Sequence, residues 1–71
     1  MKNFLILIML SWKNEAGEYK EPRLVKVEAE PGTSEEALAS AASDKALDYF
    51  NRVYAEHGNE LISIVPLETI Q

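Results

Sequence analysis

The chain has 71 residues, of which 46% are hydrophobic and 27% are charged, and it contains no cysteine. This length allows one domain with one modest core, and the apolar fraction is too high for a disordered segment. The lack of cysteine excludes disulfides, thiolate chemistry and the usual zinc sites, and it is typical of a reducing, cytoplasmic compartment. The formal net charge of −5 disfavours direct binding to the phosphates of nucleic acids.

Residues 4–10 are apolar throughout and admit two interpretations. The first interpretation is the apolar region of a secretory signal peptide. Seven residues are at the lower limit of length for such a region, and no small-residue cleavage site follows in residues 11–15. They are also too few to span a bilayer, so no membrane association is expected. The aliphatic and aromatic side chains, without Gly or Pro, favour a strand at about 3–12. Because its odd-numbered and even-numbered side chains are both apolar, both faces of this strand should be covered, and we expect it at the centre of a sheet.

A second strand is expected at about 20–30, after the polar residues 13–18, which predict a hairpin connection longer than two residues. From Arg23 onward apolar and polar side chains alternate, as in a strand with one solvated face. One face would carry Val25, Val27 and Ala29, and the other Leu24, Lys26 and Glu28. Pro22 lacks a backbone N–H, which places this strand at a sheet edge.

A helix is expected at about 34–57. Thr33 as N-cap and Glu36 three positions later form a capping box, and Gly58 provides the stop. At helical spacing, one apolar stripe is expected to face the sheet. Its members are Leu38, Ala39, Ala42, Ala46, Tyr49, Phe50 and Val53.

The last strand is expected at about 60–66, ending at Pro66, and the tail of residues 67–71 could extend it. The element order β-β-α-β over residues 1–71 predicts a single α+β domain. The hairpin pairs the first two strands, and the third returns beside the apolar first strand after the helix. We therefore predict a three-stranded antiparallel sheet in the order 2-1-3, with one long helix packed on one face.

No combination of residues indicates an enzyme, a metal site or a cofactor. The single histidine, His57, falls in the last turn of the predicted helix, where a cation is favoured, and it has no cysteine or second histidine to share a metal. The serines lack the context of a nucleophile elbow, and the isolated glycines do not form a phosphate-binding loop. The basic residues between 13 and 26 are interrupted by glutamates, which favours solvated charges over a nucleic-acid surface.

The uncovered face of the predicted sheet is the feature that points to function. If the helix covers the even-numbered side chains of the first strand, a set of mostly apolar side chains is left on the other face: Leu5, Leu7, Met9, Leu24 and Lys26. In the reversed assignment the even-numbered residues from Phe4 to Trp12 would be exposed, so an apolar patch remains either way. An apolar patch on a small protein generally marks an interaction surface. The alternative is that the C-terminal residues 67–71 fold over it. The leading hypothesis is a protein–protein interaction module, either a homodimer or a binder of another protein.

Two further hypotheses remain open. One is an acidic inhibitor, of the kind found in phages and mobile elements, that occupies a basic groove on a nuclease or another nucleic-acid-binding protein. Its candidate surface is formed by four carboxylates: Glu28, Glu30, Glu35 and Glu36.

The other is an antitoxin-like regulatory protein. Residues 32–38, together with Ala46 and Leu47, resemble the helix entry of HicB-type antitoxins, which also follows a hairpin. The Pro-Gly-Cys turn of that family is absent here, because Thr33 follows Pro31-Gly32. No site residue is therefore transferred from that family to this chain.

Overall fold

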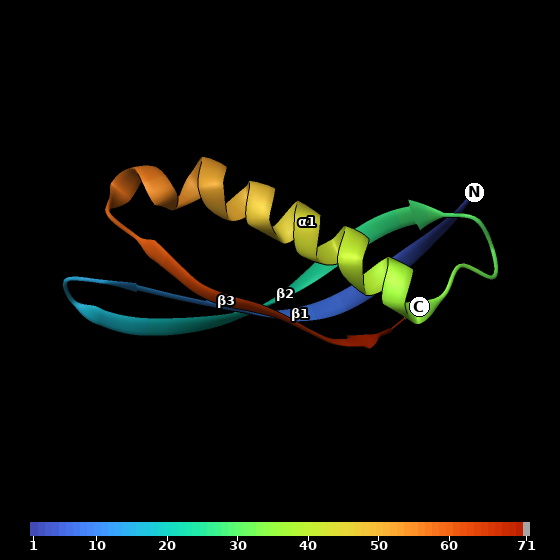
Figure 1. Ribbon diagram of the computed structural model, residues 1–71, viewed down its shortest axis with the longest axis horizontal. Helices are drawn as coiled ribbons and strands as arrows, with labels where there is room; N and C mark the ends of the chain where they lie inside the picture. The colour runs from blue at the N-terminus through green and yellow to red at the C-terminus, as the bar shows by residue number, and fades with distance from the viewer. Residues whose placement is uncertain (71) are drawn as a thin grey trace.

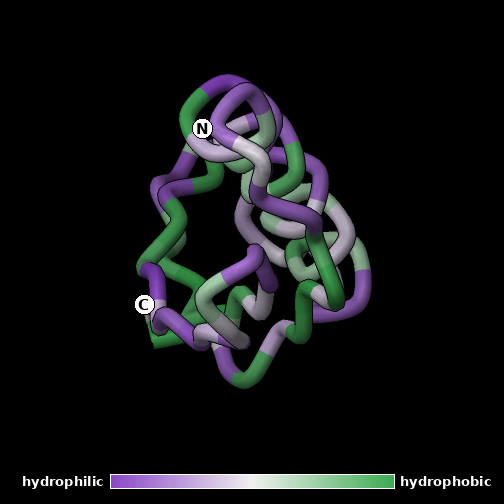
Figure 2. Tube along the Cα trace, turned by 90° about the vertical axis from the view of Figure 1, so that its left-hand side faces the viewer, coloured by the Kyte–Doolittle hydropathy of each residue, from purple (hydrophilic) through white to green (hydrophobic). Residues whose placement is uncertain are grey.

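The computed structural model describes residues 1–70 of the chain. Strands β1 (Lys2–Asn14), β2 (Gly17–Ala29) and β3 (Glu60–Thr69) form one antiparallel sheet in the order β2-β1-β3. Between β2 and β3 the chain forms helix α1 (Glu35–Val53) and a short 3₁₀ helix, η1 (Ala55–His57). Helix α1 lies along one side of the strongly twisted sheet (Figure 1), and Figure 2 shows the helix nearly end-on beside the strands. The predicted fold class and strand order are confirmed.

The hairpin between β1 and β2 is tighter than expected. Asn14 pairs with Gly17, so only Glu15 and Ala16 form the turn, and the longer connection predicted from residues 13–18 is wrong. The Asn14 side-chain oxygen accepts a hydrogen bond of 2.8 Å from the Ala16 N–H, and Gly17 adopts a φ of 140°. The asparagine therefore stabilises the turn locally, and polar residues that resemble a loop in sequence remain paired as strand.

Strand β3 continues through Pro66 instead of ending there. Pro66 pairs with Ile8, and a register shift follows between this pair and the pair of Leu7 with Glu68. Beyond the strand, the Ile70 N–H donates to the Leu5 carbonyl at 2.7 Å. This bond shows that the Leu5 backbone faces β3, so by the alternation of an antiparallel ladder the Ile8 backbone faces β2. The Pro66 nitrogen therefore points to the open edge, where no ladder bond is lost.

Helix α1 starts and ends at positions different from those predicted. Ser34, not Thr33, is the N-cap, and its hydroxyl accepts a hydrogen bond of 3.1 Å from the Ala37 N–H. The Thr33 hydroxyl instead donates to the Glu30 carbonyl at 2.6 Å, which closes the preceding turn. At the other end the α-helix stops at Val53 and continues as η1, and Gly58, at a φ of 78°, ends the segment as predicted.

The core lies between α1 and the face of β1 that carries its even-numbered residues. Its buried hydrophobic side chains are Phe4, Ile6, Ile8, Leu10, Val27, Leu38, Ala42, Ala46 and Phe50. Four members of the predicted helical stripe, Leu38, Ala42, Ala46 and Phe50, are thus buried. Val53 is 41% exposed, which contradicts the prediction for that residue: it is the last residue of α1, and the chain turns into η1 directly after it.

An aromatic cluster joins the hairpin to the C-terminal end of α1. The Trp12 ring lies between Tyr19 and Tyr54, with ring centroids 5.9 and 5.0 Å away and nearly parallel planes. Tyr49 meets Tyr54 edge-on at 5.8 Å, and Phe50 lies 5.7 Å from it at a tilt. The stacked and the edge-on arrangements are both favourable for aromatic pairs. The cluster therefore anchors the long hairpin, which extends well beyond the centre of the sheet (Figure 1).

The ionisation of Tyr54 provides a test of this cluster. Hydrogen bonding with Tyr49, partial burial and the Glu21 carboxylate together raise the pKa of Tyr54 from 10.0 to about 12. The folded state holds this proton more tightly than the unfolded state. The cluster therefore stabilises the fold fully below pH 10, and that contribution is expected to disappear as the pH rises from 10 towards 12. An absorbance titration should show a late phenolate step that is missing in Tyr54→Phe; an unchanged step would contradict the assignment.

Candidate protein interface

The face of the sheet opposite α1 is built by the alternation of side chains along β1. Ile6, Ile8 and Leu10 point to the helix and are at most 1% exposed. The odd-numbered residues Leu5, Leu7 and Met9 point the other way and are only half-buried. Because β1 is the central strand, its neighbours β2 and β3 shield these three side chains partly from the sides. We call this surface the open face.

Two cross-strand rows form the centre of the open face. In one row Leu7 lies between Leu24 of β2 and Glu68 of β3, and in the other Met9 lies between Pro22 and Val65. Directly paired residues share a face of the sheet, so all six side chains belong to the open face. Leu24 is 59% exposed and Val65 is 46% exposed, so both are accessible large hydrophobic side chains of this face.

The C-terminal residues do not cover the open face within the described residues 1–70. Instead of folding over it, residues 67–69 continue β3 beside β1, and Ile70 still bonds to the Leu5 backbone. Leu67 and Ile70 are themselves 52% and 48% exposed. The alternative in which residues 67–71 shield the patch is therefore wrong as far as Ile70, and Gln71 lies outside the described residues.

Charged residues of both signs flank the apolar rows of the open face. On β2, Lys26 pairs with Leu5 and Lys20 pairs with Ser11, so two lysines border the open face along this strand. On β3, Glu68 pairs with Leu7. A second glutamate of β3, Glu60, lies 3.9 Å from Lys13 near the hairpin end. Glu18 and Glu28 lie on the same face of β2, opposite Lys13 and Asn3, so the β2 side of the open face carries charges of both signs.

Both edges of the sheet are poorly suited to adding another strand. The backbone of Lys26 faces outward, because its partner Leu5 bonds to β3, and its carbonyl accepts a hydrogen bond of 2.7 Å from the Lys45 side chain. By the same alternation the Pro22 nitrogen also faces outward, where it offers no donor, and Pro66 has the same effect on β3. Such devices protect edge strands from pairing with other chains. The faces, not the edges, are therefore available for specific contacts.

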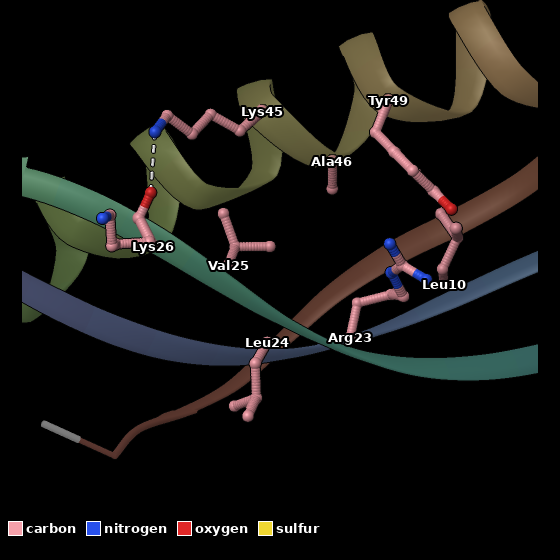
Figure 3. Close-up of a pocket in the computed structure, with 8 residues that line it drawn as sticks. All are labelled: Leu10, Arg23, Leu24, Val25, Lys26, Lys45, Ala46 and Tyr49. Atoms are coloured by element: carbon pink, nitrogen blue, oxygen red, sulfur yellow. Dashed lines mark hydrogen bonds between the residues drawn. The ribbon is translucent and has the colours of Figure 1, made fainter.

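A shallow groove of about 300 Å³ lies on the helix side, between α1 and β2 (Figure 3). Val25 lines it from β2 and Ala46 from α1, and the Arg23 guanidinium lies 4.2 Å from the centre of the Tyr49 ring. Arg23 is also 3.3 Å from the Glu21 carboxylate. Leu24, on the same strand, points away from the helix (Figure 3). Because Arg23 already has these partners, the groove is better explained as the margin of the core than as a ligand site.

The four glutamates of the predicted acidic surface are all exposed and come from neighbouring parts of the chain. Glu28 is near the end of β2, Glu30 follows it, and Glu35 and Glu36 open α1. These segments meet at the end of the molecule that also holds both termini (Figure 1). Glu35 and Glu36 occupy the first helical turn, where the helix dipole favours negative charge. Their role in the helix is sufficient to explain that pair.

The remaining sequence candidates do not form a chemical site within residues 1–70. His57 ends η1 and is exposed beside Gly58. In this part of the chain no group of three or more His, Cys, Asp or Glu side chains is arranged to hold a metal ion. Of the helices in residues 1–70, none combines the length and apolar character needed to cross a membrane.

Sequence reasoning named residues of β1 and β2 in the open face and expected the third strand beside them, but it did not identify which residues of β3 contribute. Val65 and Glu68 reach this face through the register of β3 against β1, and that register shifts twice along the strand. Lys20 was recognised only as one of several charges near the hairpin. Its pairing with Ser11, which is 7% exposed, places it beside the apolar rows. The alternation of side chains along β2 could have placed Lys20 on the open face, because Lys20 lies four residues from Leu24 and therefore on the same side of the strand.

Comparison of the chain with protein-family models, with curated proteins and with solved structures finds no match. The function is therefore inferred from the geometry of the open face.

Proposed function

We propose that this chain is a non-catalytic, cytoplasmic protein-interaction module that self-associates through the open face of its sheet. The observation that supports it is the pair of apolar rows centred on Leu7 and Met9, which no segment of residues 1–70 covers. Burial of such side chains is favoured roughly in proportion to the area removed from water. A second copy supplies a matching apolar face, and two sheets packed in this way are separated by about 10 Å.

The size of the open face sets the expected strength of the dimer. Three strands over eight residues cover roughly 400 Å² per copy, from the usual strand spacing and rise. Two copies would bury about twice this area, which is below the roughly 1,600 Å² of a standard stable interface. We therefore expect a weak, concentration-dependent dimer, with a dissociation constant in the micromolar range.

Substitution of Leu7 by lysine is expected to abolish this association. The change places a charge at the centre of the open face, and in a symmetric dimer the two introduced ammonium groups lie close to each other. The dissociation constant should rise by at least about 100-fold, equivalent to about 3 kcal/mol. Light scattering after size exclusion, over a hundredfold range of concentration, measures the change in mass.

Leu47→Lys is the matched control for this experiment. Leu47 is 42% exposed and lies on α1, outside the open face, so the same substitution there should leave the dimer intact. Circular dichroism should show unchanged helix content in both variants. A wild-type protein that is monomeric at every concentration would refute self-association, and a Leu7→Lys variant that still dimerises would show that another surface is used.

A further inference from the structure

We propose that a hollow at the hairpin end of the open face binds a zwitterionic α-amino acid with an apolar side chain. This inference goes beyond the proposed self-association and does not rest on it. The hollow has a volume of about 510 Å³, and its lining residues come from all three strands: Ser11, Glu18, Tyr19, Lys20, Ile62 and Ser63. It lies one row past the apolar rows, so it is continuous with the open face.

Two small side chains create the hollow. Ser11 of β1 pairs with Ser63 of β3 and with Lys20 of β2, and directly paired residues share a face of the sheet. On one side of this row lies the longer side chain of Met9, and on the other side lies Lys13. The surface is therefore depressed at the two serines.

The hydroxyl of Ser11 is the polar group that the hollow leaves without a partner. Ser11 is only 7% exposed, and its side chain makes no hydrogen bond within residues 1–70; nor does that of Ser63. In the same part of the chain no fully enclosed side-chain N or O atom lacks a partner, so the Ser11 hydroxyl must still open into the hollow. A buried hydroxyl is stabilised by a partner, and each of these two can both donate and accept.

Two opposite charges border the same hollow. Lys20 and Glu18 have side chains on the open face, and neither forms an ion pair within residues 1–70, whereas Lys13 nearby is 3.9 Å from Glu60. They are two residues apart on β2, which is about 7 Å. A ligand with one sign of charge is attracted by one of them and repelled by the other. An α-amino acid carries both signs on one carbon, so its carboxylate can face Lys20 and the serines while its ammonium group faces Glu18.

The apolar part of the ligand has a surface to contact in the same hollow. Ile62 lines it, is 46% exposed and has no partner on β1, because the register shifts between the pairs of Ser11 and Trp12. Val65, also 46% exposed, is in the next row. An aliphatic side chain placed there removes apolar surface from water. Because the ligand is small and the charges are exposed, we expect a dissociation constant in the millimolar range.

Titration of the nitrogen-15-labelled protein with L-leucine tests this site. The backbone amide signals of Ser11, Lys20 and Ser63 should shift in a saturable way. N-acetyl-L-leucine lacks the ammonium charge, and L-leucinamide lacks the carboxylate. Each analogue should bind at least about tenfold more weakly than leucine, because it loses one charge-assisted contact.

Neutral variants of the two charged residues identify the site. Glu18→Gln and Lys20→Gln should each raise the dissociation constant for leucine by about tenfold. Glu28→Gln and Lys26→Gln are the matched controls, because they make the same changes on the same face of β2 at its other end. Neither control should change the binding by more than about twofold.

The titration is run on the wild type and on Leu7→Lys, so that the site is tested whether or not the chain self-associates. Saturable leucine binding that the first two variants weaken and the controls leave intact supports the site, even if the wild type is monomeric. An analogue that binds as tightly as leucine would overturn the zwitterion. The site is also overturned if leucine causes no shifts at tens of millimolar, or if the controls weaken binding as much as Glu18→Gln and Lys20→Gln.

Discussion

Replacement of Phe50 by alanine is expected to destabilise the domain by about 3–5 kcal/mol, the usual cost of removing a buried phenylalanine. Phe50 is 2% exposed and is the largest fully buried side chain on α1. Its ring lies 6.4 Å from that of Trp12 and 5.7 Å from that of Tyr54. The truncation therefore leaves a cavity where the helix meets the aromatic cluster. A core in a chain of this size rarely supplies more than about 3–5 kcal/mol, so the variant should be largely unfolded.

Urea unfolding followed by circular dichroism measures this loss. Phe50→Leu, which keeps most of the volume, should cost less than about 1.5 kcal/mol and provides a value if the alanine variant does not fold. Val53→Ala is the control on the same helix. Because Val53 is 41% exposed, its truncation should cost less than about 1 kcal/mol. A larger loss for Val53→Ala than for Phe50→Ala would contradict the described helix orientation.

The pair Ile8→Ala and Met9→Ala tests which face of β1 belongs to the core. Ile8 is fully buried between the sheet and α1, so its truncation is expected to cost about 2–5 kcal/mol. Met9, the next residue, is half-buried on the open face, and its loss from the monomer should cost less than about 1 kcal/mol.

Both variants are to be unfolded at a protein concentration well below that at which the wild type associates, because dimerisation adds stability that depends on concentration. Under these conditions the difference between neighbours reports only the burial of each side chain. Equal losses would mean that both faces of β1 are covered in the monomer. That result would remove the basis for the proposed interface.

The same two residues separate local from tertiary information in this chain. The apolar run at 4–10 predicts a central strand from its composition alone, and the structure confirms it. Its two faces look alike in sequence, however, because Leu5, Leu7 and Met9 are as hydrophobic as their neighbours. Only the position of α1 decides that the even-numbered residues are buried, and that position depends on packing over the whole sheet.

Element boundaries depended on hydrogen bonds that sequence patterns do not resolve. Thr33 and Ser34 are both good N-cap residues, and Ser34 caps α1 because the Thr33 hydroxyl is bonded to Glu30. Pro66 is typically a strand terminator, yet β3 continues past it because its nitrogen faces the open edge. In each case the competing partner or the free edge exists only once the chain has folded.

Sequence patterns alone predicted the types and order of the elements, the central position of β1 and the edge position of β2. These follow from periodicity, composition and the missing N–H of Pro22, which act over a few residues. The tertiary structure alone decided the path of residues 67–70 and the placement of Glu68 beside Leu7. Both depend on the two register shifts of β3 against β1, and these are set by contacts between residues about 50 to 60 positions apart in the chain.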